Sequence, residues 1–131
     1  VFTNADAKTA GTIQPRSAAD SMYPQDLWRW LDDTSRRTGA DFVAIPHNSN
    51  LSKGYMFGET LLGGQDYTAE MARIRARWEP VAEVTQIKGD SETHPELSPD
   101  DPFADFETYG YYIQNDASSY EVQPGDYARS A

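Results

Sequence analysis

Two stretches of the chain carry apolar residues at the spacing of a helix. In residues 24–37 one wide stripe is apolar and the remainder is charged or polar, the stripe being Leu27, Trp28, Trp30 and Leu31. Pro24 suits the first turn of a helix, and Gly39 suits its C-terminal stop. Residues 68–79 repeat the pattern behind a Thr68 suited to the N-cap, with Met71, Ile74 and Trp78. The pattern predicts helices over 24–37 and 68–79.

Two other stretches have the pattern of strands. Four consecutive apolar residues, Phe42 to Ile45, are typical of a strand buried on both faces, and Pro46 ends it because proline cannot donate to a ladder. Residues 81–87 predict a second strand. Because a helix separates the two, we expect a βαβ unit. The predicted fold class is therefore α/β, with a parallel strand pair, two helices and long irregular loops.

This arrangement predicts one core between the helices and the strands, made of Leu27, Trp30, Leu31, Val43, Ile45, Ile74, Trp78 and Val84. Residues 1–87 form the α/β part of this scheme. Residues 88–131 are rich in acids and prolines, and we expect them to be mostly an irregular loop and tail. The chain opens on Val1 without an initiator Met and ends on what reads as the first turn of a helix. We therefore expect residues 1–131 to be a single fragment of a larger domain.

Composition narrows the range of functions. The 131 residues carry a net charge of -10, which argues against nucleic acid as a partner because phosphate binding needs clustered Lys and Arg. The sequence has no cysteine, so disulfides, thiolate metal sites and a cysteine nucleophile are excluded. No apolar run approaches the roughly 20 residues of a membrane-spanning helix, so we expect no membrane insertion. The localisation stays open.

The best candidate for a functional residue is His47, just past the predicted end of the strand at 42–45. In α/β folds, ligands bind at the C-terminal ends of the strands. A neutral imidazole there can bind a divalent metal such as Zn, Mn or Fe, with carboxylates completing the site. The polar residues that follow, Asn48 and Asn50, would line the substrate. The alternative is that His47 caps the strand by bonding a nearby carbonyl.

The second candidate group follows the second strand, in residues 88–94. It combines a cation, two acids and the only other histidine, and its predicted catalytic residues are Lys88, Asp90, Glu92 and His94. In a right-handed βαβ unit both strands run the same way, so residues 88–94 and the loop at 48–58 should lie on one rim. Such a rim would supply ligands, a base and a group that holds an anion. The alternative is a solvated turn in which Asp90 and Ser91 bond local amides.

A third candidate is Glu83, inside the second predicted strand. A buried carboxylate is costly unless it is paired, hydrogen-bonded or bound to a metal. Glu83 either serves a site or faces one of the arginines of the preceding helix, at positions 73, 75 and 77.

Two long runs carry a resemblance to a known family. Residues 44–57 (AIPHNSNLSKGYMF) and 77–95 (RWEPVAEVTQIKGDSETHP), with shorter runs at 97–99 and 103–107, resemble the bacterial domain-of-unknown-function family 3604. That family is similar to the polymerase-and-histidinol-phosphatase superfamily, whose distorted β/α barrel holds metals at strand ends for phosphoester hydrolysis. The resemblance implies that the βαβ segment is barrel-like and that His47 is a metal ligand. The superfamily's His-x-His and Asp-x-His motifs are absent, which implies an inactive fragment.

Two hypotheses for function follow. In the first, the chain is the central portion of a metal-dependent hydrolase of phosphate or related esters, its partners being the rest of the parent chain and a small-molecule ester substrate. In the second, it is a non-catalytic binding or interaction module of a larger secreted bacterial protein. The substrate, the metal and the oligomeric state stay open in both.

Overall fold

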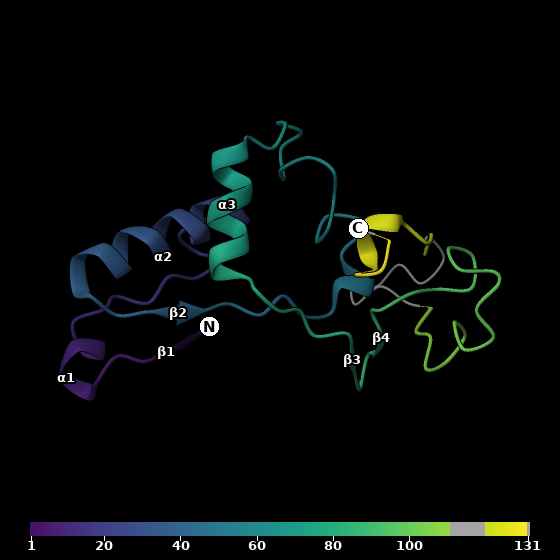
Figure 1. Ribbon diagram of the computed structural model, residues 1–131, viewed down its shortest axis with the longest axis horizontal. Helices are drawn as coiled ribbons and strands as arrows, with labels where there is room; N and C mark the ends of the chain where they lie inside the picture. Colours follow the sequence, from purple (N-terminus) through teal and green to yellow (C-terminus); the bar gives the residue numbers. More distant parts are fainter. Residues whose placement is uncertain (111–119, 131) are drawn as a thin grey trace. The chain divides into compact units, whose positions relative to one another are not determined.

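Both predicted helices are present in a computed structural model of the chain, which describes residues 1–110 and 120–130 (Figure 1). Helix α2 spans Pro24–Thr38, and helix α3 spans Ala69–Trp78 and packs against α2. The hydroxyl of Thr68 accepts a hydrogen bond from Met71 N, which satisfies one of the free amides at the start of α3. Gly39 ends α2 in the left-handed conformation, with φ 73°. A one-turn helix, α1 (Ala7–Ala10), precedes them.

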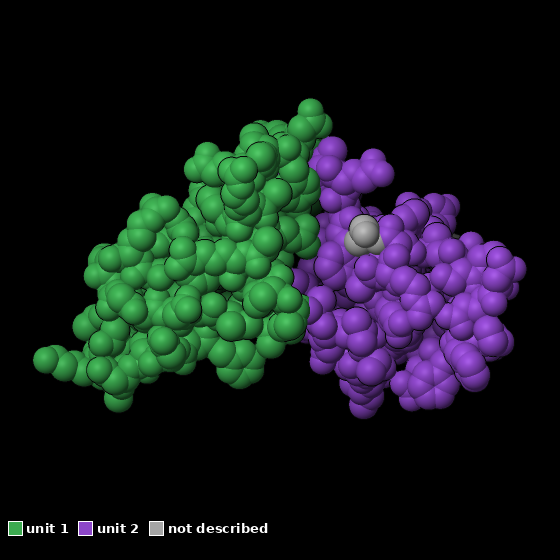
Figure 2. Space-filling view, in the orientation of Figure 1, with its two compact units in different colours: residues 1–45, 62–81 green, residues 46–61, 82–131 purple. Residues whose placement is uncertain are grey.

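The chain divides into two compact units, each built from two separate segments (Figure 2). Unit 1 comprises residues 1–45 and 62–81, and unit 2 comprises residues 46–61 and 82–131. None of the helices in the described part of the chain is long and apolar enough to cross a membrane.

An aromatic core joins the two helices of unit 1. Trp78 and Leu31 are fully buried, and the ring of Phe42 meets that of Trp78 edge-on at 6.1 Å between centroids. Trp28, 2% exposed, donates its indole N–H to Glu79 Oε1 at 2.7 Å. The other carboxylate oxygen of Glu79 accepts from Arg75, whose guanidinium lies over the Trp28 ring at 5.2 Å. Both oxygens of the Glu79 carboxylate, at the edge of the core, thus accept a hydrogen bond.

The predicted parallel strand pair is wrong, and the barrel-like βαβ segment is wrong with it. Strand β2 covers only Phe42–Val43 and pairs antiparallel with β1, Phe2–Thr3. Strand β3 covers Thr85–Gln86 and pairs antiparallel with β4, Gly89–Asp90. The described residues hold these two two-stranded sheets and no parallel pair.

Proline explains why the longer ladders do not form. In unit 1, Ala44 N donates to Trp78 O at 2.7 Å, but the bonding does not continue as a ladder. In unit 2, Glu83 N donates to Pro46 O at 2.9 Å. Pro46 and Pro80 each lack the N–H that a continued ladder would require at those positions. The apolar run therefore makes isolated backbone bonds in place of a central strand.

The predicted core is confirmed only in part. Leu31 and Trp78 are fully buried as expected, whereas Trp30 and Ile74 are only half-buried. Val84 is 39% exposed and belongs to unit 2, so its assignment to a common core is wrong.

The core of unit 1 depends most on Trp78. We predict that Trp78→Ala lowers the free energy of unfolding by about 3–5 kcal/mol, because it leaves a large cavity among Phe42, Leu31 and the helix contact. Urea unfolding of the 131-residue chain measures this. The matched control is Val81→Ala, since Val81 is 53% exposed and its truncation should change stability by no more than about 0.5 kcal/mol. Equal losses in the two variants would contradict this core.

Candidate functional site

The candidate site lies in unit 2, on the loop that begins at Pro46. Pro46 is buried, and the His47 side chain that follows it is exposed. Asn48 adopts the left-handed conformation, with φ 57°, and turns the chain into the short 3-10 helix η1, Ser49–Leu51. Asn48 Oδ1 and Ser49 Oγ are buried and have no hydrogen-bond partner among the described residues. An exposed imidazole is thus followed in the chain by two residues whose buried side-chain oxygens have no hydrogen-bond partner among the described residues.

Asn50 fixes this loop against the segment at 88–94. The Asn50 side chain is fully buried, donates to Lys88 O at 2.8 Å and accepts from Ser91 Oγ at 2.9 Å. Its backbone N–H donates to the same Ser91 hydroxyl at 3.3 Å. The two loops that the sequence analysis placed on one rim therefore do lie together. The cause is this buried amide and hydroxyl, and not a parallel sheet.

Asp126 anchors the other end of the loop. It lies in the 3-10 helix η3 (Pro124–Asp126), is fully buried, and accepts from Ser52 Oγ at 2.8 Å and from Gly54 N at 2.7 Å. Phe57 N donates to the carbonyl of Gly125 at 2.9 Å. Burial raises the pKa of Asp126, against the lowering effect of the bonds from Gly54 and Ser52.

The four predicted catalytic residues all have structural partners. Lys88 stands in the turn between β3 and β4, and its carbonyl receives the Asn50 amide. Asp90 accepts from the backbone N–H of Glu92 at 2.9 Å and of Thr93 at 3.2 Å. The Glu92 carboxylate pairs with Arg129.

His94, the fourth, is half-buried. Its ring lies 5.7 Å from that of Tyr127, and its Nδ1 accepts from Glu96 N at 3.3 Å. The catalytic roles of Lys88, Asp90, Glu92 and His94 stay predictions, as do the substrate-lining roles of Asn48 and Asn50.

Glu83 finds a partner that the sequence analysis did not consider. Its carboxylate accepts from Gln86 Nε2 at 2.8 Å, three residues along the chain. Two of the three arginines that were candidates to face it are engaged within unit 1, where Arg75 pairs with Glu79 and Arg77 lies over the Trp78 ring. The local amide therefore provides the pairing that a half-buried carboxylate needs.

The described residues do not fit a complete metal centre. Within residues 1–110 and 120–130, no group of three or more His, Asp or Glu side chains is placed to hold a metal ion. A tetrahedral site with catalytic activity needs three protein ligands. His47, with its neighbouring oxygens, supplies at most a part of such a site.

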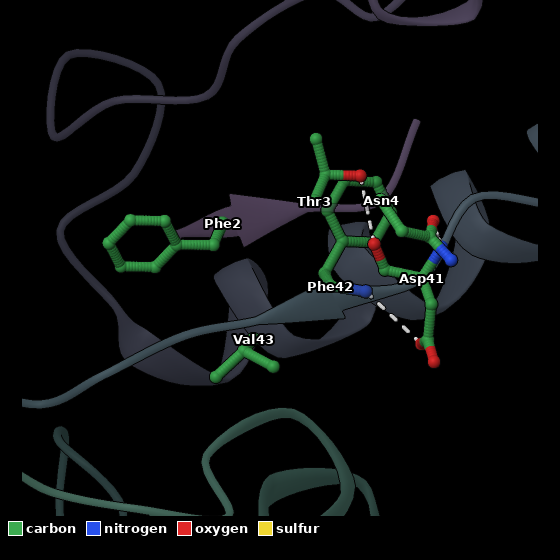
Figure 3. A pocket seen from close by; sticks show the side chains of 6 residues that line it. All are labelled: Phe2, Thr3, Asn4, Asp41, Phe42 and Val43. Carbon is green, nitrogen blue, oxygen red and sulfur yellow. Dashed lines mark hydrogen bonds between the residues drawn. The ribbon is translucent and has the colours of Figure 1, made fainter. Parts of the chain in front are cut away.

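Each unit has a cavity lined entirely by described residues. The cavity of unit 1, about 200 Å³, lies over β1 and β2 and is lined by Phe2, Thr3, Asn4, Asp41, Phe42 and Val43 (Figure 3). Its one ionisable side chain, Asp41, accepts from Phe42 N at 3.1 Å. The cavity of unit 2, about 250 Å³, includes Asp90 and Glu92. Only the second therefore contains predicted catalytic residues.

Four residues that hold the site together were not candidates from the sequence, namely Ser52, Asp126, Tyr127 and Arg129, and Ser91 was considered only for bonds to local amides. Tyr127 is 1% exposed, and its hydroxyl bonds that of Tyr120 at 2.7 Å. Arg129 N donates to Glu92 O at 2.9 Å. The available signal was that a segment with few apolar residues can be ordered only if buried polar groups bond one another.

The comparison with known families gives the same assignment as the long runs at 44–57 and 77–95. A family model described as "Protein of unknown function (DUF3604)" matches residues 1–131. The chain belongs to the DUF3604 family. No curated protein and no solved structure matches the chain.

The junction of the two loops in this DUF3604 chain can be tested through Asn50. We predict that Asn50→Ala destabilises the chain by about 1–3 kcal/mol for each group that loses its partner, which are the Lys88 carbonyl as acceptor and the Ser91 O–H as donor. Ser91→Ala should cost less than Asn50→Ala. The double variant should lose less than the sum of the two, with a coupling of about 0.5–3 kcal/mol. Strict additivity in urea unfolding would show that the two side chains act independently.

The buried carboxyl of Asp126 predicts a pH dependence of stability. A carboxyl whose pKa is raised on folding contributes stability that is fully present below its unfolded value of 3.8 and is lost as pH rises through the folded pKa. The free energy of unfolding of wild type, relative to that of the non-titrating Asp126→Asn, should therefore fall as pH rises from below 3.8 towards neutrality.

The same titration in a Ser52→Ala background provides the companion test. The bond from Ser52 lowers the pKa of Asp126, so its removal should extend the loss of stability to higher pH. A difference between wild type and Asp126→Asn that stays constant or grows with pH would contradict the burial of an ionisable group here.

Proposed function

We propose that this chain contributes one part of a metal-dependent hydrolase site that acts on phosphate or related esters. The observation that carries the proposal is the exposed His47, which directly follows a buried proline and directly precedes Asn48 and Ser49, whose buried side-chain oxygens are unpaired. Imidazole is a common ligand of Zn, Mn and Fe, and unpaired buried oxygens are sites that a ligand or substrate can satisfy. The resemblance of the Ile-Pro-His context to the polymerase-and-histidinol-phosphatase superfamily supports the same proposal.

A catalytic metal site requires more ligands than this segment supplies. One imidazole cannot hold a catalytic transition metal, and the described residues offer no cluster of three ligands. The remaining ligands must come from residues outside the described part, such as other segments of a longer family member. The role of the loop anchors is then positional, because Asn50 and Asp126 hold the loop from both ends and so fix the backbone that presents His47.

The test uses a longer DUF3604 protein that contains this segment. We predict that His47→Ala lowers the content of divalent metal after dialysis, measured by elemental analysis, and abolishes hydrolysis of an aryl phosphate ester. Loss of one of the ligands of a metal should weaken binding strongly because the site has few ligands. Unchanged metal stoichiometry and unchanged turnover would reject the proposal.

His94→Gln is the matched control, because His94 is the only other histidine and its ring is packed against Tyr127. It should keep the metal. If it also loses hydrolysis, His94 acts in the reaction without binding the metal, and the two roles are separated by the two measurements.

The second candidate function is a binding module without catalysis. The observation that favours it is the cavity of unit 2, which is lined by charged and aromatic side chains and does not include His47. A His47→Ala variant that binds its ligand normally and never contained metal would favour this function over the first.

A further inference from the structure

The cavity of unit 2 has walls from three separate segments. The first segment is β4 with the residues that follow it, and it supplies Asp90 and Glu92. The second is the group of turns around 101–106, with Asp101, Phe103 and Phe106. The third is the C-terminal segment, with Arg129. Backbone bonds fix these walls, since Asp90 N donates to Glu107 O at 2.9 Å and Arg129 N donates to Glu92 O at 2.9 Å. The cavity, about 250 Å³, is therefore a built feature of unit 2.

The charge of the lining is negative. Three carboxylates face one guanidinium, which gives a net charge of two negative units around the cavity. Arg129 donates to both Glu92 and Asp101, so its own charge is already paired. The whole chain carries -10, which adds to the same field. Phosphate, sulfate and carboxylate ligands are repelled from such a cavity.

The carboxylates are also committed as hydrogen-bond acceptors. Asp90 accepts two backbone N–H groups, and Asp101 accepts Phe103 N at 3.0 Å besides Arg129. Their negative charge therefore still attracts a bound cation, but few of their lone pairs are left to accept further hydrogen bonds. A cation that needs many acceptors, such as a primary ammonium, gains less here than one that needs only a negative field.

Two exposed aromatic rings complete the lining. Phe103 is 78% exposed and Phe106 is 66% exposed, three residues apart in one turn-rich segment. Large apolar side chains left in water beside a cavity are typical of ligand sites. The face of an aromatic ring attracts cations, and quaternary ammonium groups are recognised by aromatic side chains in this way.

We propose that this cavity binds a quaternary ammonium group carried by a small molecule without a phosphate. Such a group has a full positive charge, an apolar surface and no N–H, which matches the negative field, the exposed rings and the committed carboxylates. The proposal goes beyond the hydrolase proposal and does not depend on it, because His47 is not among the residues that line the cavity.

The test is a titration of the 131-residue chain with choline, followed by NMR shifts or by calorimetry. Its uncharged carbon analogue, 3,3-dimethylbutan-1-ol, should bind about tenfold more weakly or worse, because it loses the attraction to the net negative charge. Phosphocholine should also bind more weakly than choline, since its phosphate is repelled. Equal binding of choline and the alcohol, or no binding of choline, would overturn the proposal.

The aromatic contribution is tested by Phe103→Leu, which keeps apolar bulk and removes the ring face. It should weaken choline binding by about 2- to 5-fold, and Phe103→Trp should restore or strengthen it, because Trp provides the best ring face. Both variants should fold, since Phe103 is mostly exposed. The control is Phe2→Leu, an exposed ring of unit 1 at 68%, which should leave binding unchanged. A Phe103→Leu variant with wild-type affinity would overturn the role of the ring.

Discussion

The bonds of one buried amide, Asn50, are the interaction on which unit 2 most depends. Among its described residues, this unit has a hairpin of two two-residue strands and two short 3-10 helices as regular structure, so few of its described backbone groups are paired in ladders. Asn50 joins two loops 38 to 41 residues apart, through Lys88 O and Ser91 Oγ. Without such long-range bonds, ordering the loops would cost conformational entropy that the few buried apolar groups of the unit cannot offset.

The two units achieve order by different physical means. In unit 1 a helix pair buries Trp28, Leu31 and Trp78, and the hydrophobic effect supplies most of the stabilisation. In unit 2 the fully buried side chains are chiefly polar, and Asn50, Ser91 and Asp126 act through specific partners, as Asp126 does with Ser52 and Gly54. A polar core of this kind is less tolerant of substitution than an apolar one, because one lost partner leaves another group buried and unsatisfied.

This difference explains how much could be predicted from the sequence. Both helices were predictable, because their apolar residues repeat at helical spacing, Trp28 and Leu31 in one and Met71, Ile74 and Trp78 in the other. Pro24, Gly39 and Thr68 also occupy positions that favour helix ends. The strand pairing was not predictable. The apolar run at 42–45 has the composition of a central strand, but its composition does not show which segment it pairs with, or that the prolines at 46 and 80 prevent a continued ladder. The bonds of Asn50 and Asp126 were beyond prediction for another reason. They join residues far apart in the chain, and neither amides nor carboxylates have a periodicity that identifies their partners.

The same bonds decide which polar residues of the candidate site are available for function. Asp90, Glu92, Asp101 and Arg129 are tied to one another or to the backbone, and Asn50 is fully buried, so these residues build the walls of the site. Two kinds of exposed side chain lie on this held backbone, in separate places: the imidazole of His47 on the loop after Pro46, and the rings of Phe103 and Phe106 at the cavity. Binding a ligand at these side chains costs little backbone entropy, because the backbone around them is already ordered. The buried polar bonds of unit 2 make it sensitive to substitution. Because the same bonds hold the backbone in place, they also make these exposed groups suitable for binding.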